Sequence, residues 1–431
     1  MAPRAVRSKE RLKVLAVVLA AGKGTRMRSS LPKVLHELRG KPLLGYVLDA
    51  IRNAGIKRTV VVVGYGEKQV RSFLKTDRLQ IVRQWPPKGT GHAVLCAEKY
   101  LRHWKGLVLV MPGDAPLVTA ESLKAMLKAH QFQKASATVL TAHVKEPHGY
   151  GRIIRRAGQV AGIREELDAT SAERRIHEIN SGIYLFDAEE LMSHVRSLKA
   201  ANQKKEYYLT DTIALLAHSG QQVAGYQTND AMEVLGINSR QELSQIEKAM
   251  NQNEIVKHQK NGVTIISPEN TFIAKGVKIG RDTVIYPFTW IEKSVRIGER
   301  CQIGPFSAIR QGTQIEKGAT VGSFVELVRS RIGKQSRVKH LTYLGDAVVG
   351  ADVNIGAGTV TANYDGKGKH QTHIRQKAFI GSNTVLVAPV TVGERAKTGA
   401  GAVVLSGSRI GKGQTVAGVP AKPIQRGKRK K

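Results

Sequence analysis

Residues 273–327 read IAKGVKIGRDTVIYPFTWIEKSVRIGERCQIGPFSAIRQGTQIEKGATVGSFVEL, and in this stretch an aliphatic residue returns at every sixth position. Glycine follows that residue in several hexads, as at Ile279-Gly280 and Val321-Gly322. Neither an α-helix nor a simple β-strand has a period of six. A hexad repeat is typical of a parallel β-helix, in which each hexad forms one side of a triangular coil and its aliphatic residue points inward. Helices of this hexapeptide kind coil left-handedly, against the usual crossover rule.

The repeat continues beyond this stretch, first with irregular steps and then again with a period of six. One segment, Asn363–Arg375, interrupts it with polar and basic residues. A loop that leaves a solenoid is usually functional, so we predict a protruding functional loop there. The further inward positions are Ile332, Val338, Leu344, Val349, Ile355, Ile380, Leu386, Val392, Thr398, Val404, Ile410 and Val416.

The first half of the chain has a different pattern, in which short apolar runs alternate with amphipathic segments. This alternation predicts a mostly parallel sheet with helices on both faces, whose ligands bind at the carboxyl ends of the strands. The expected strands are Val14–Val18, Val60–Val63, Leu107–Met111 and Ala137–Leu140, and the expected helices are Leu43–Asn53 and Leu117–His130.

A glycine-rich loop, Leu19-Ala-Ala-Gly-Lys-Gly-Thr-Arg-Met27, follows the first expected strand. Its glycines let backbone N–H groups approach an anion, and Lys23, Arg26 and Lys33 add positive charge. The loop is neither the Walker phosphate loop nor the dinucleotide fingerprint. We predict that it holds a polyphosphate.

Composition limits the class of protein without deciding its function. The 431 residues include only two cysteines, so no disulfide framework is indicated and we expect a cytoplasmic protein. The net charge of +34 fits attraction of small anions, nonspecific contact with nucleic acid or anionic membrane, or a background bias of the source. Because the charge is spread along the chain, its distribution favours the third explanation, a compositional bias of the source. No segment approaches the length of a membrane span.

The order strand, glycine loop, Pro32-Lys33 resembles the signature of sugar-1-phosphate nucleotidylyltransferases. Joined to a hexapeptide half, it resembles the bifunctional N-acetylglucosamine-1-phosphate uridyltransferase/glucosamine-1-phosphate acetyltransferase family. The motifs that carry this resemblance run from about residue 14 to 416. They are Leu19–Met27, Gly89-Thr-Gly-His-Ala93, Gly113-Asp-Ala-Pro116, Gly149-Tyr-Gly-Arg152, Glu178-Ile-Asn-Ser-Gly182, His340-Leu-Thr-Tyr-Leu-Gly-Asp346, Asn354-Ile-Gly-Ala-Gly358 and Asn363-Tyr-Asp-Gly366.

The resemblance implies an α/β fold, with a Rossmann-like nucleotidyltransferase domain followed by a linker helix and a left-handed parallel β-helix. It implies acetylation of glucosamine-1-phosphate and then uridylylation to UDP-N-acetylglucosamine, a precursor for peptidoglycan and lipopolysaccharide, with acetyl-CoA and UTP as substrates and Mg²⁺ as cofactor. It also implies a homotrimer, with no specific nucleic acid and no membrane span. The expected parts are a basic N-terminal extension 1–13, a nucleotidyltransferase domain 14–238, a linker helix 239–261, an acetyltransferase domain 262–420 and a basic tail 421–431.

For uridylyl transfer, in which the anions UTP and sugar-1-phosphate must come together, the resemblance implies three groups of residues. Asp114 and Asn238 hold Mg²⁺, and Asn238 also belongs to the sugar-phosphate site. Residues expected to bind UTP are Leu19, Ala20, Ala21, Gly22, Arg26, Lys33, Gln84, Gly89 and Thr90, and residues expected to bind the amino sugar are Gly151, Glu165 and Asn180. Taken singly, Asp114 and Asn238 could equally cap helices or organise turns.

For acetyl transfer, the resemblance makes His340 the general base, since imidazole titrates near neutral pH. The substrate-binding residues it implies are Arg310, Glu326, Tyr343, Asn354, Asn363 and Tyr364, and the acetyl-CoA groove would contain Ala357, Ser382 and Ala400.

Three features depart from the family pattern, and one of them is a β-helix that is about two coils shorter between the linker and Arg310 on the hexad count. Val328, followed by Arg329, stands where the family has a basic residue that contacts phosphate, and Gly418-Val-Pro420 lacks a nearby arginine. An alternative interpretation is therefore a nucleotidylyltransferase whose β-helix serves only oligomerisation. A nucleic-acid-binding protein is a third interpretation, but no reading module or aromatic platform supports it.

Overall fold

The computed structural model describes residues 13–75 and 79–424 and divides after Ser244 into two compact units. The predicted N-terminal extension, apart from residue 13, and the end of the predicted basic tail, residues 425–431, lie outside the described residues.

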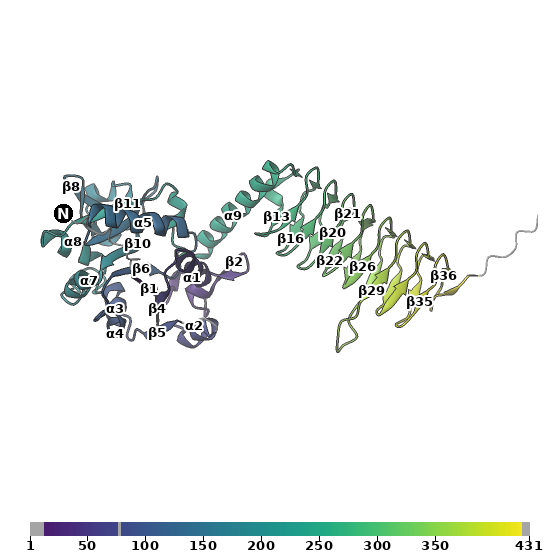
Figure 1. Ribbon diagram of the computed structural model, residues 1–431, viewed down its shortest axis with the longest axis horizontal. Coiled ribbons are helices and arrows are strands. Elements are labelled where there is room, and N and C mark those ends of the chain that lie inside the picture. The colour runs from purple at the N-terminus through teal and green to yellow at the C-terminus, as the bar shows by residue number, and fades with distance from the viewer. Residues whose placement is uncertain (1–12, 76–78, 425–431) are drawn as a thin grey trace, which may run out of the picture. The chain divides into compact units, whose positions relative to one another are not determined.

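The first unit is built on a mixed sheet with the strand order β11-β7-β10-β6-β1-β4-β5 (Figure 1). β1 lies parallel to both β4 and β6, whereas β10 runs antiparallel to β6 and β7. A two-stranded extension, β8 and β9, leaves the sheet at β10. The strands are β1 (Val14–Ala20), β4 (Arg58–Val63), β5 (Gln80–Arg83), β6 (Leu107–Pro112), β7 (Ala137–His143), β8 (Arg152–Arg156), β9 (Gln159–Arg164), β10 (Glu178–Asp187) and β11 (Val223–Gln227); a separate hairpin pairs β2 (Glu37–Leu38) with β3 (Lys41–Pro42).

Helices cover both faces of this sheet, because successive residues of a buried strand point to opposite sides. Val17 of β1 packs in one core with α3, α4, α7 and α8, while its neighbour Val18 packs in another with α1, α2 and α5. The helices are α1 (Leu43–Asn53), α2 (Glu67–Leu74), α3 (Thr90–Leu95), α4 (Glu98–Leu101), α5 (Ala120–Gln133), α6 (Ser171–Arg174), α7 (Ala188–Val195) and α8 (Thr210–His218), with 3-10 turns η1 (Thr25–Met27), η2 (Lys33–Leu35), η3 (Glu166–Asp168) and η4 (Ala231–Val234).

The second unit contains a prism of stacked coils in which short strands form three parallel sheets, here called the first, second and third faces (Figure 1). The first face contains β12 (Thr264–Ile265), β15 (Val284–Ile285), β18 (Gln302–Ile303), β21 (Thr320–Ser323), β24 (Arg337–His340), β27 (Asn354–Ile355), β30 (Phe379–Ile380), β33 (Lys397–Thr398), β36 (Thr415–Ala417) and the antiparallel β37 (Lys422–Pro423). The second contains β13 (Phe272–Ile273), β16 (Trp290–Ile291), β19 (Ala308–Ile309), β22 (Glu326–Val328), β25 (Tyr343–Gly345), β28 (Val360–Ala362), β31 (Val385–Val387) and β34 (Val403–Val404). The third contains β14 (Lys278–Ile279), β17 (Arg296–Ile297), β20 (Gln314–Ile315), β23 (Arg331–Ile332), β26 (Ala347–Val349), β29 (Thr372–Ile374), β32 (Val390–Val392) and β35 (Arg409–Ile410).

The hexad positions form the core of the prism. All predicted inward side chains are buried except Ile279, which is partly buried and packs against the same core. Each strand aligns its inward residue with those of the coils before and after it, as Ile291, Ile309 and Leu327 do on the second face. The predicted fold class is confirmed: an α/β nucleotidyltransferase fold is followed by parallel strands consistent with a left-handed β-helix.

The predicted interruption is shorter than expected. The loop 363–371 projects between β28 and β29 (Figure 1). Thr372 and Ile374 are buried in the regular third face, where β29 pairs with β26 and β32. The expectation that the interruption extends to Arg375 is therefore wrong, because the polar sequence after Gln371 already alternates inward and outward side chains.

Helix α9 (Arg240–Lys260) leads into the prism, and its second half closes the first coil. Ile255 lies in the prism core. The Asn251 side-chain amide donates to the Thr271 carbonyl at 2.7 Å and accepts from the Ile273 N–H at 3.0 Å. Asn251 thus satisfies backbone groups that no preceding coil can pair.

Candidate active sites

The glycine loop begins where β1 meets the ends of two neighbouring strands. The Gly113 N–H donates to the Leu19 carbonyl at 2.9 Å, and the Tyr65 N–H donates to the Ala21 carbonyl at 3.1 Å. Ala20 and Ala21 are buried, and a Cβ on Gly64 would lie 2.7 Å from the Ala21 carbonyl oxygen. The backbone therefore enters the loop in a fixed position, and Gly22 beyond it is exposed.

Two predicted magnesium ligands converge on one lysine. The Lys33 ammonium forms an ion pair with Asp114 and donates a hydrogen bond of 2.6 Å to the Asn238 amide oxygen. The Ile237 N–H donates to the Asp114 carbonyl at 3.1 Å, which fixes the two segments beside each other. The lysine side chain is only 13% exposed, so its charge is largely shielded from solvent. The structure thus brings Lys33, Asp114 and Asn238 together.

Tyr150 is a neighbour of this group that the sequence analysis did not select. Burial is the main cause that raises the pKa of its hydroxyl, and the charges of Glu242 and Asp114 raise it further while Arg26 lowers it. The charges of Arg26 and Asp114 thus both act on this tyrosine. Glu242 accepts a hydrogen bond of 2.5 Å from the Asn238 N–H. The Gly149–Arg152 motif contains Tyr150, but only Gly151 of this motif was predicted to bind a substrate.

Gln84, Gly89 and Thr90, three of the residues expected to bind UTP, lie together in one turn. Gln84 is buried, and its side-chain amide donates to the Gly89 carbonyl at 2.8 Å. Gly89 has φ 103°, and a Cβ there would lie 2.6 Å from the Tyr207 carbonyl oxygen, so both conformation and space require glycine. Thr90 accepts a hydrogen bond of 2.9 Å from the Leu209 N–H. The turn is thereby held against the segment that precedes α8.

The predicted amino-sugar residues are linked through Tyr184. Asn180 donates to the Gly151 carbonyl through its N–H at 2.8 Å and to the Tyr184 hydroxyl through its side chain at 2.7 Å. Burial raises the pKa of the Tyr184 hydroxyl, and the nearby Glu165 charge raises it further. Burial also raises the pKa of Glu165, whose carboxylate accepts from the Thr210 hydroxyl at 3.2 Å. Gly151, Asn180 and Glu165 therefore lie around one largely buried cluster.

A buried ion pair that the sequence analysis missed supports this cluster. Arg152 is 2% exposed and pairs with Glu166 at 2.8 Å. The same carboxylate accepts from the Gly149 N–H at 3.0 Å. The Gly149–Arg152 turn is therefore fixed by a charge-assisted contact. A buried arginine cannot be recognised from a sequence in which lysine and arginine are so abundant.

In the second unit, Arg310 and Glu326 lie on the second face of the prism. The Arg310 guanidinium donates to Glu326 at 2.8 Å and to Glu292 at 3.0 Å. These two contacts raise the pKa of Arg310. Val328 follows Glu326 on the same outer surface, between Arg310 and Gly345 in the register of the coils. An apolar side chain therefore lies next to the predicted phosphate contact.

Tyr343 and Asn363 meet over Gly345. A Cβ on this glycine would lie 2.7 Å from the Tyr343 hydroxyl and 2.6 Å from the Asn363 side-chain nitrogen. Asn363 is buried, and its amide donates to Asp346 at 2.5 Å. The absence of a side chain at Gly345 is thus what allows both predicted groups to approach each other.

His340 is exposed at the corner between the first and second faces, where it ends β24. It begins a column of small residues, because the register of the coils places Ala357, Ser382 and Ala400 at the same corner position in the next three coils. The Asn383 N–H donates to the Ala357 carbonyl at 2.7 Å, and the Gly401 N–H donates to the Ser382 carbonyl at 2.8 Å. The structure therefore aligns these four predicted residues in one row.

The other predicted acetyl-transfer residues lie apart from this row within one chain. Asn354 belongs to β27 on the first face, whereas Tyr343 and Glu326 lie on the second. Tyr364 is 60% exposed, and its hydroxyl donates to the Gly366 carbonyl inside the projecting loop at 2.8 Å. A single chain therefore does not gather all the predicted acetyl-transfer residues.

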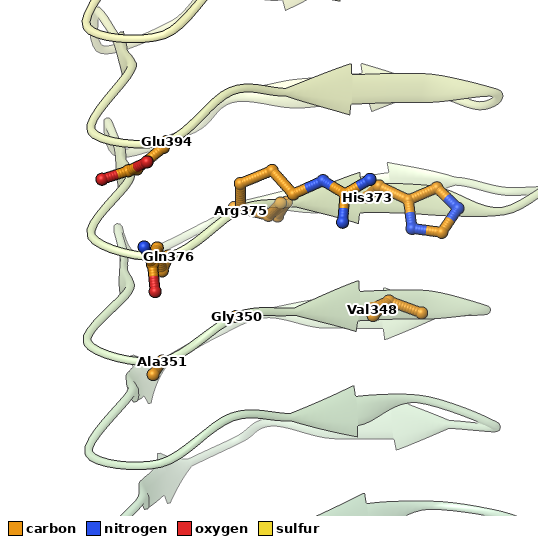
Figure 2. A pocket seen from close by; sticks show the side chains of 8 residues that line it. Val348, Gly350, Ala351, His373, Arg375, Gln376 and Glu394 are labelled. Carbon is orange, nitrogen blue, oxygen red and sulfur yellow. The ribbon is translucent and has the colours of Figure 1, made fainter.

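A hollow of about 420 Å³ lies on the third face (Figure 2). Figure 2 shows the Arg375 side chain running along the coil toward His373, with the small residues Gly350 and Ala351 in the coil below. Glu394 lies at the corner beside it. None of its lining residues was predicted to bind a substrate.

Within residues 13–75 and 79–424, no three His, Cys, Asp or Glu side chains cluster as a metal site. Across those same ranges, no helix combines the length and apolar character needed to cross a membrane.

Comparison with known proteins identifies both halves. The family model of the MobA-like NTP transferase domain matches residues 16–182. The models of the GMPPB C-terminal domain and of the hexapeptide repeat of succinyl-transferase match residues 267–364 and 374–406.

Relatives over nearly the full length share the name "Bifunctional protein GlmU". The protein from Shouchella clausii is 44% identical over 423 residues, which cover 90% of this chain and 93% of the relative. Those from Carboxydothermus hydrogenoformans and Pelotomaculum thermopropionicum are also 44% identical, over 90% and 87% of this chain and 94% and 89% of the relatives. The chain therefore belongs to the GlmU family of bifunctional enzymes, with a nucleotidyltransferase half and a hexapeptide acetyltransferase half.

Proposed function

We propose that the first unit transfers the uridylyl group of UTP to N-acetylglucosamine-1-phosphate. The sugar-phosphate oxygen attacks the α-phosphorus, the bond between the α- and β-phosphates breaks, and pyrophosphate leaves. Because two anions must meet, catalysis depends on positive charge and orientation more than on a base. Lys33 and Arg26 supply cations beside the exposed glycine loop, and the Glu165–Asn180 cluster supplies hydrogen-bonding groups for the amino sugar.

The residues at Lys33 fit the magnesium ion that this reaction requires. The Asp114 carboxylate and the Asn238 amide oxygen converge on a single cationic group, the Lys33 ammonium. Carboxylate and amide oxygens are ligands that Mg²⁺ accepts, and two protein ligands suit an ion that keeps waters and substrate phosphates. When bound there, the ion would neutralise charge on the phosphates.

We infer that the second unit transfers the acetyl group of acetyl-CoA to the amine of glucosamine-1-phosphate. His340 removes a proton from the amine, whose nitrogen then attacks the thioester carbonyl. The carbon–sulfur bond breaks, and the proton passes to the leaving CoA thiolate. Tyr343 and Asn363 orient the substrate, and Arg310 holds its phosphate.

One observation carries the acetyl-transfer proposal: His340 stands at the head of the column Ala357, Ser382 and Ala400. Three successive coils place small side chains that are exposed or partly exposed at this corner, and such a row suits a long, thin cofactor arm. Its reactive end would lie beside the imidazole, which is exposed and able to exchange protons.

We further propose that the active assembly is a trimer. Predicted acetyl-transfer residues lie on two outer faces of the prism, so a neighbouring copy would complete the groove at their shared corner. Phe288, Phe306 and Phe324 form an exposed stack along this same corner, with ring centroids 4.9 and 5.1 Å apart. A neighbouring copy would cover such an apolar ladder.

Val328 favours a second candidate, in which the chain catalyses uridylyl transfer alone and the prism only assembles the protein. Two assays on one purified preparation decide between them. The first follows pyrophosphate release from UTP, N-acetylglucosamine-1-phosphate and Mg²⁺. The second follows the acetyl-CoA-dependent loss of the free amine of glucosamine-1-phosphate.

A matched pair of variants tests the two proposed sites independently. We expect His340→Ala to abolish the second reaction and keep the first, and Asp114→Asn to do the reverse. A wild-type protein with uridylyl transfer and no amine loss would establish the second candidate. Pyrophosphate release that is equally fast in Asp114→Asn would contradict the proposed nucleotide site.

A further inference from the structure

Arg329, which follows the valine that departs from the family pattern, is held in a bidentate ion pair. Its Nε and Nη2 atoms donate to the two carboxylate oxygens of Asp346 at 2.7 and 2.8 Å. The coil register aligns the two residues, since Val328 pairs with Gly345 and the Asp346 N–H donates to the Val328 carbonyl at 2.9 Å. Such a fork fixes the plane of the carboxylate as well as its position.

Asp346 in turn holds both ends of the projecting loop. Its Oδ2 accepts from the Asn363 side-chain amide at 2.5 Å, where the loop leaves the prism. Its backbone carbonyl accepts from the Thr372 N–H at 3.2 Å, where the loop returns. Within the loop, the His370 N–H donates to the Asn363 carbonyl at 2.8 Å. The orientation of Asn363 therefore depends on a carboxylate that Arg329 holds in place.

We propose that Arg329 is a positioning residue of the acetyl-transfer site, which acts through Asp346 to orient Asn363 and to close the base of loop 363–371. This inference rests on the acetyl transfer proposed above. It also gives Arg329 a role other than the missing phosphate contact. Two of its guanidinium nitrogens donate to the Asp346 carboxylate.

The kinetic test compares Arg329→Gln and Asp346→Asn with the matched control Arg331→Gln. Arg331 is also an exposed arginine paired with a carboxylate, Glu316, at 2.8 Å, but it lies on the third face. We expect kcat for acetyl transfer to fall roughly 10- to 100-fold in the first two variants, since a misplaced orienting group costs that much. We expect no change in the control, and no change in uridylyl transfer in any of the three.

A double-mutant cycle shows whether Arg329 acts through Asn363. Asn363→Ala alone should lose activity to a similar extent. Adding Arg329→Gln to it should lower kcat by less than about twofold further, because coupled residues do not contribute additively. Fully additive losses would overturn the proposal.

Limited trypsin digestion tests the same link without any activity. Lys367 and Lys369 are exposed within the loop and provide cleavage sites. Cleavage there should be several-fold faster in Arg329→Gln and Asp346→Asn than in the wild type or Arg331→Gln, because the anchored base opens more often. Unchanged cleavage would overturn the proposed anchoring. A different result separates the two claims. If the wild-type protein shows no acetyl transfer but the two variants are still cleaved faster than the wild type, the proposed function is refuted and the anchoring of the loop stands.

Discussion

Lys33 and Asp114 form an ion pair in which the ammonium of the glycine-loop region neutralises the carboxylate that follows β6. The same ammonium donates to Asn238. The proposed magnesium ion would therefore compete with this lysine for the same two oxygens, and its binding would release the ammonium toward a substrate phosphate.

Replacement of Lys33 by methionine is therefore expected to change metal affinity and turnover in opposite directions. Without nucleotide, the Lys33→Met protein should bind Mn²⁺ about tenfold more tightly, because no internal cation opposes the ion. Uridylyl transfer should fall, since a phosphate contact is lost. Electron paramagnetic resonance titration measures free Mn²⁺ directly. Lys41→Met, which breaks the more exposed Lys41–Asp49 pair, is the matched control and should leave both quantities unchanged.

Glu165→Gln is expected to stabilise the first unit at neutral pH. Burial raises the pKa of this carboxyl in the folded protein, so folding favours its protonated form. Stability from this group is present below the ordinary carboxyl pKa and is lost as pH rises through the folded value. The glutamine variant should therefore gain about 1–3 °C in Tm at pH 7.5 and nothing at pH 4. Scanning calorimetry at the two pH values tests the sign.

Glu98→Gln is the control for this experiment, because the pKa of Glu98 is shifted in the opposite direction. Hydrogen bonds from Arg196 lower the pKa of Glu98, so its removal should not raise Tm at pH 7.5. The Glu165→Gln protein should also lose affinity for N-acetylglucosamine-1-phosphate. A variant that is more stable and equally active would remove Glu165 from the proposed site.

Ala357→Leu is expected to crowd the row of small residues beside His340. The larger side chain would enter the column of small residues, so KM for acetyl-CoA should rise roughly tenfold while uridylyl transfer stays unchanged. Ala351→Leu places the same group at the corner beside the third face and is the matched control. Equal KM values in both variants would show that this row does not hold the cofactor.

Arg152→Met is expected to destabilise the first unit. Removing one partner of a largely buried pair leaves Glu166 without its cation, at a cost of about 3 kcal/mol. Chemical denaturation followed by fluorescence would measure the loss. The double variant Arg152→Met/Glu166→Gln should recover part of it, because no unpaired charge then remains. Failure to recover would indicate that packing of the arginine dominates.

The prism was the most predictable part of the fold, because its repeat encodes the same backbone geometry in every coil. Ile309 and Leu327 are inward for the same reason, and their burial follows from their position in the hexad. The reversed direction of β10 was not predictable, since an apolar run does not reveal which way a strand crosses the sheet. The end of the loop at Gln371 was also missed, although Ile374 lies six residues before Ile380 and so already continues the hexad series.

The sequence could suggest which residues belong to the candidate sites, but it could not predict the hydrogen bonds and ion pairs among them. The family resemblance selected Lys33, Asp114 and Asn363 as candidates, and the structure places Lys33 beside Asp114 and Asn363 beside Tyr343. Their present partners depend on side-chain conformation, which a motif does not contain. Arg329 shows this most clearly, since the role proposed for it follows from a carboxylate one coil away and not from its neighbours in sequence.

The capping of the first coil by α9 bears on how this protein can change in evolution. Asn251 and Ile255 end the stack at one side, and every later coil contacts only the coils that flank it. A complete turn can therefore be inserted or deleted between the cap and Arg310 with no shift in the alignment of the remaining rungs. Such an insertion would shift the proposed acetyl-transfer site along the axis of the prism without changing the contacts within that site. The number of coils before Arg310 is therefore free to vary during evolution.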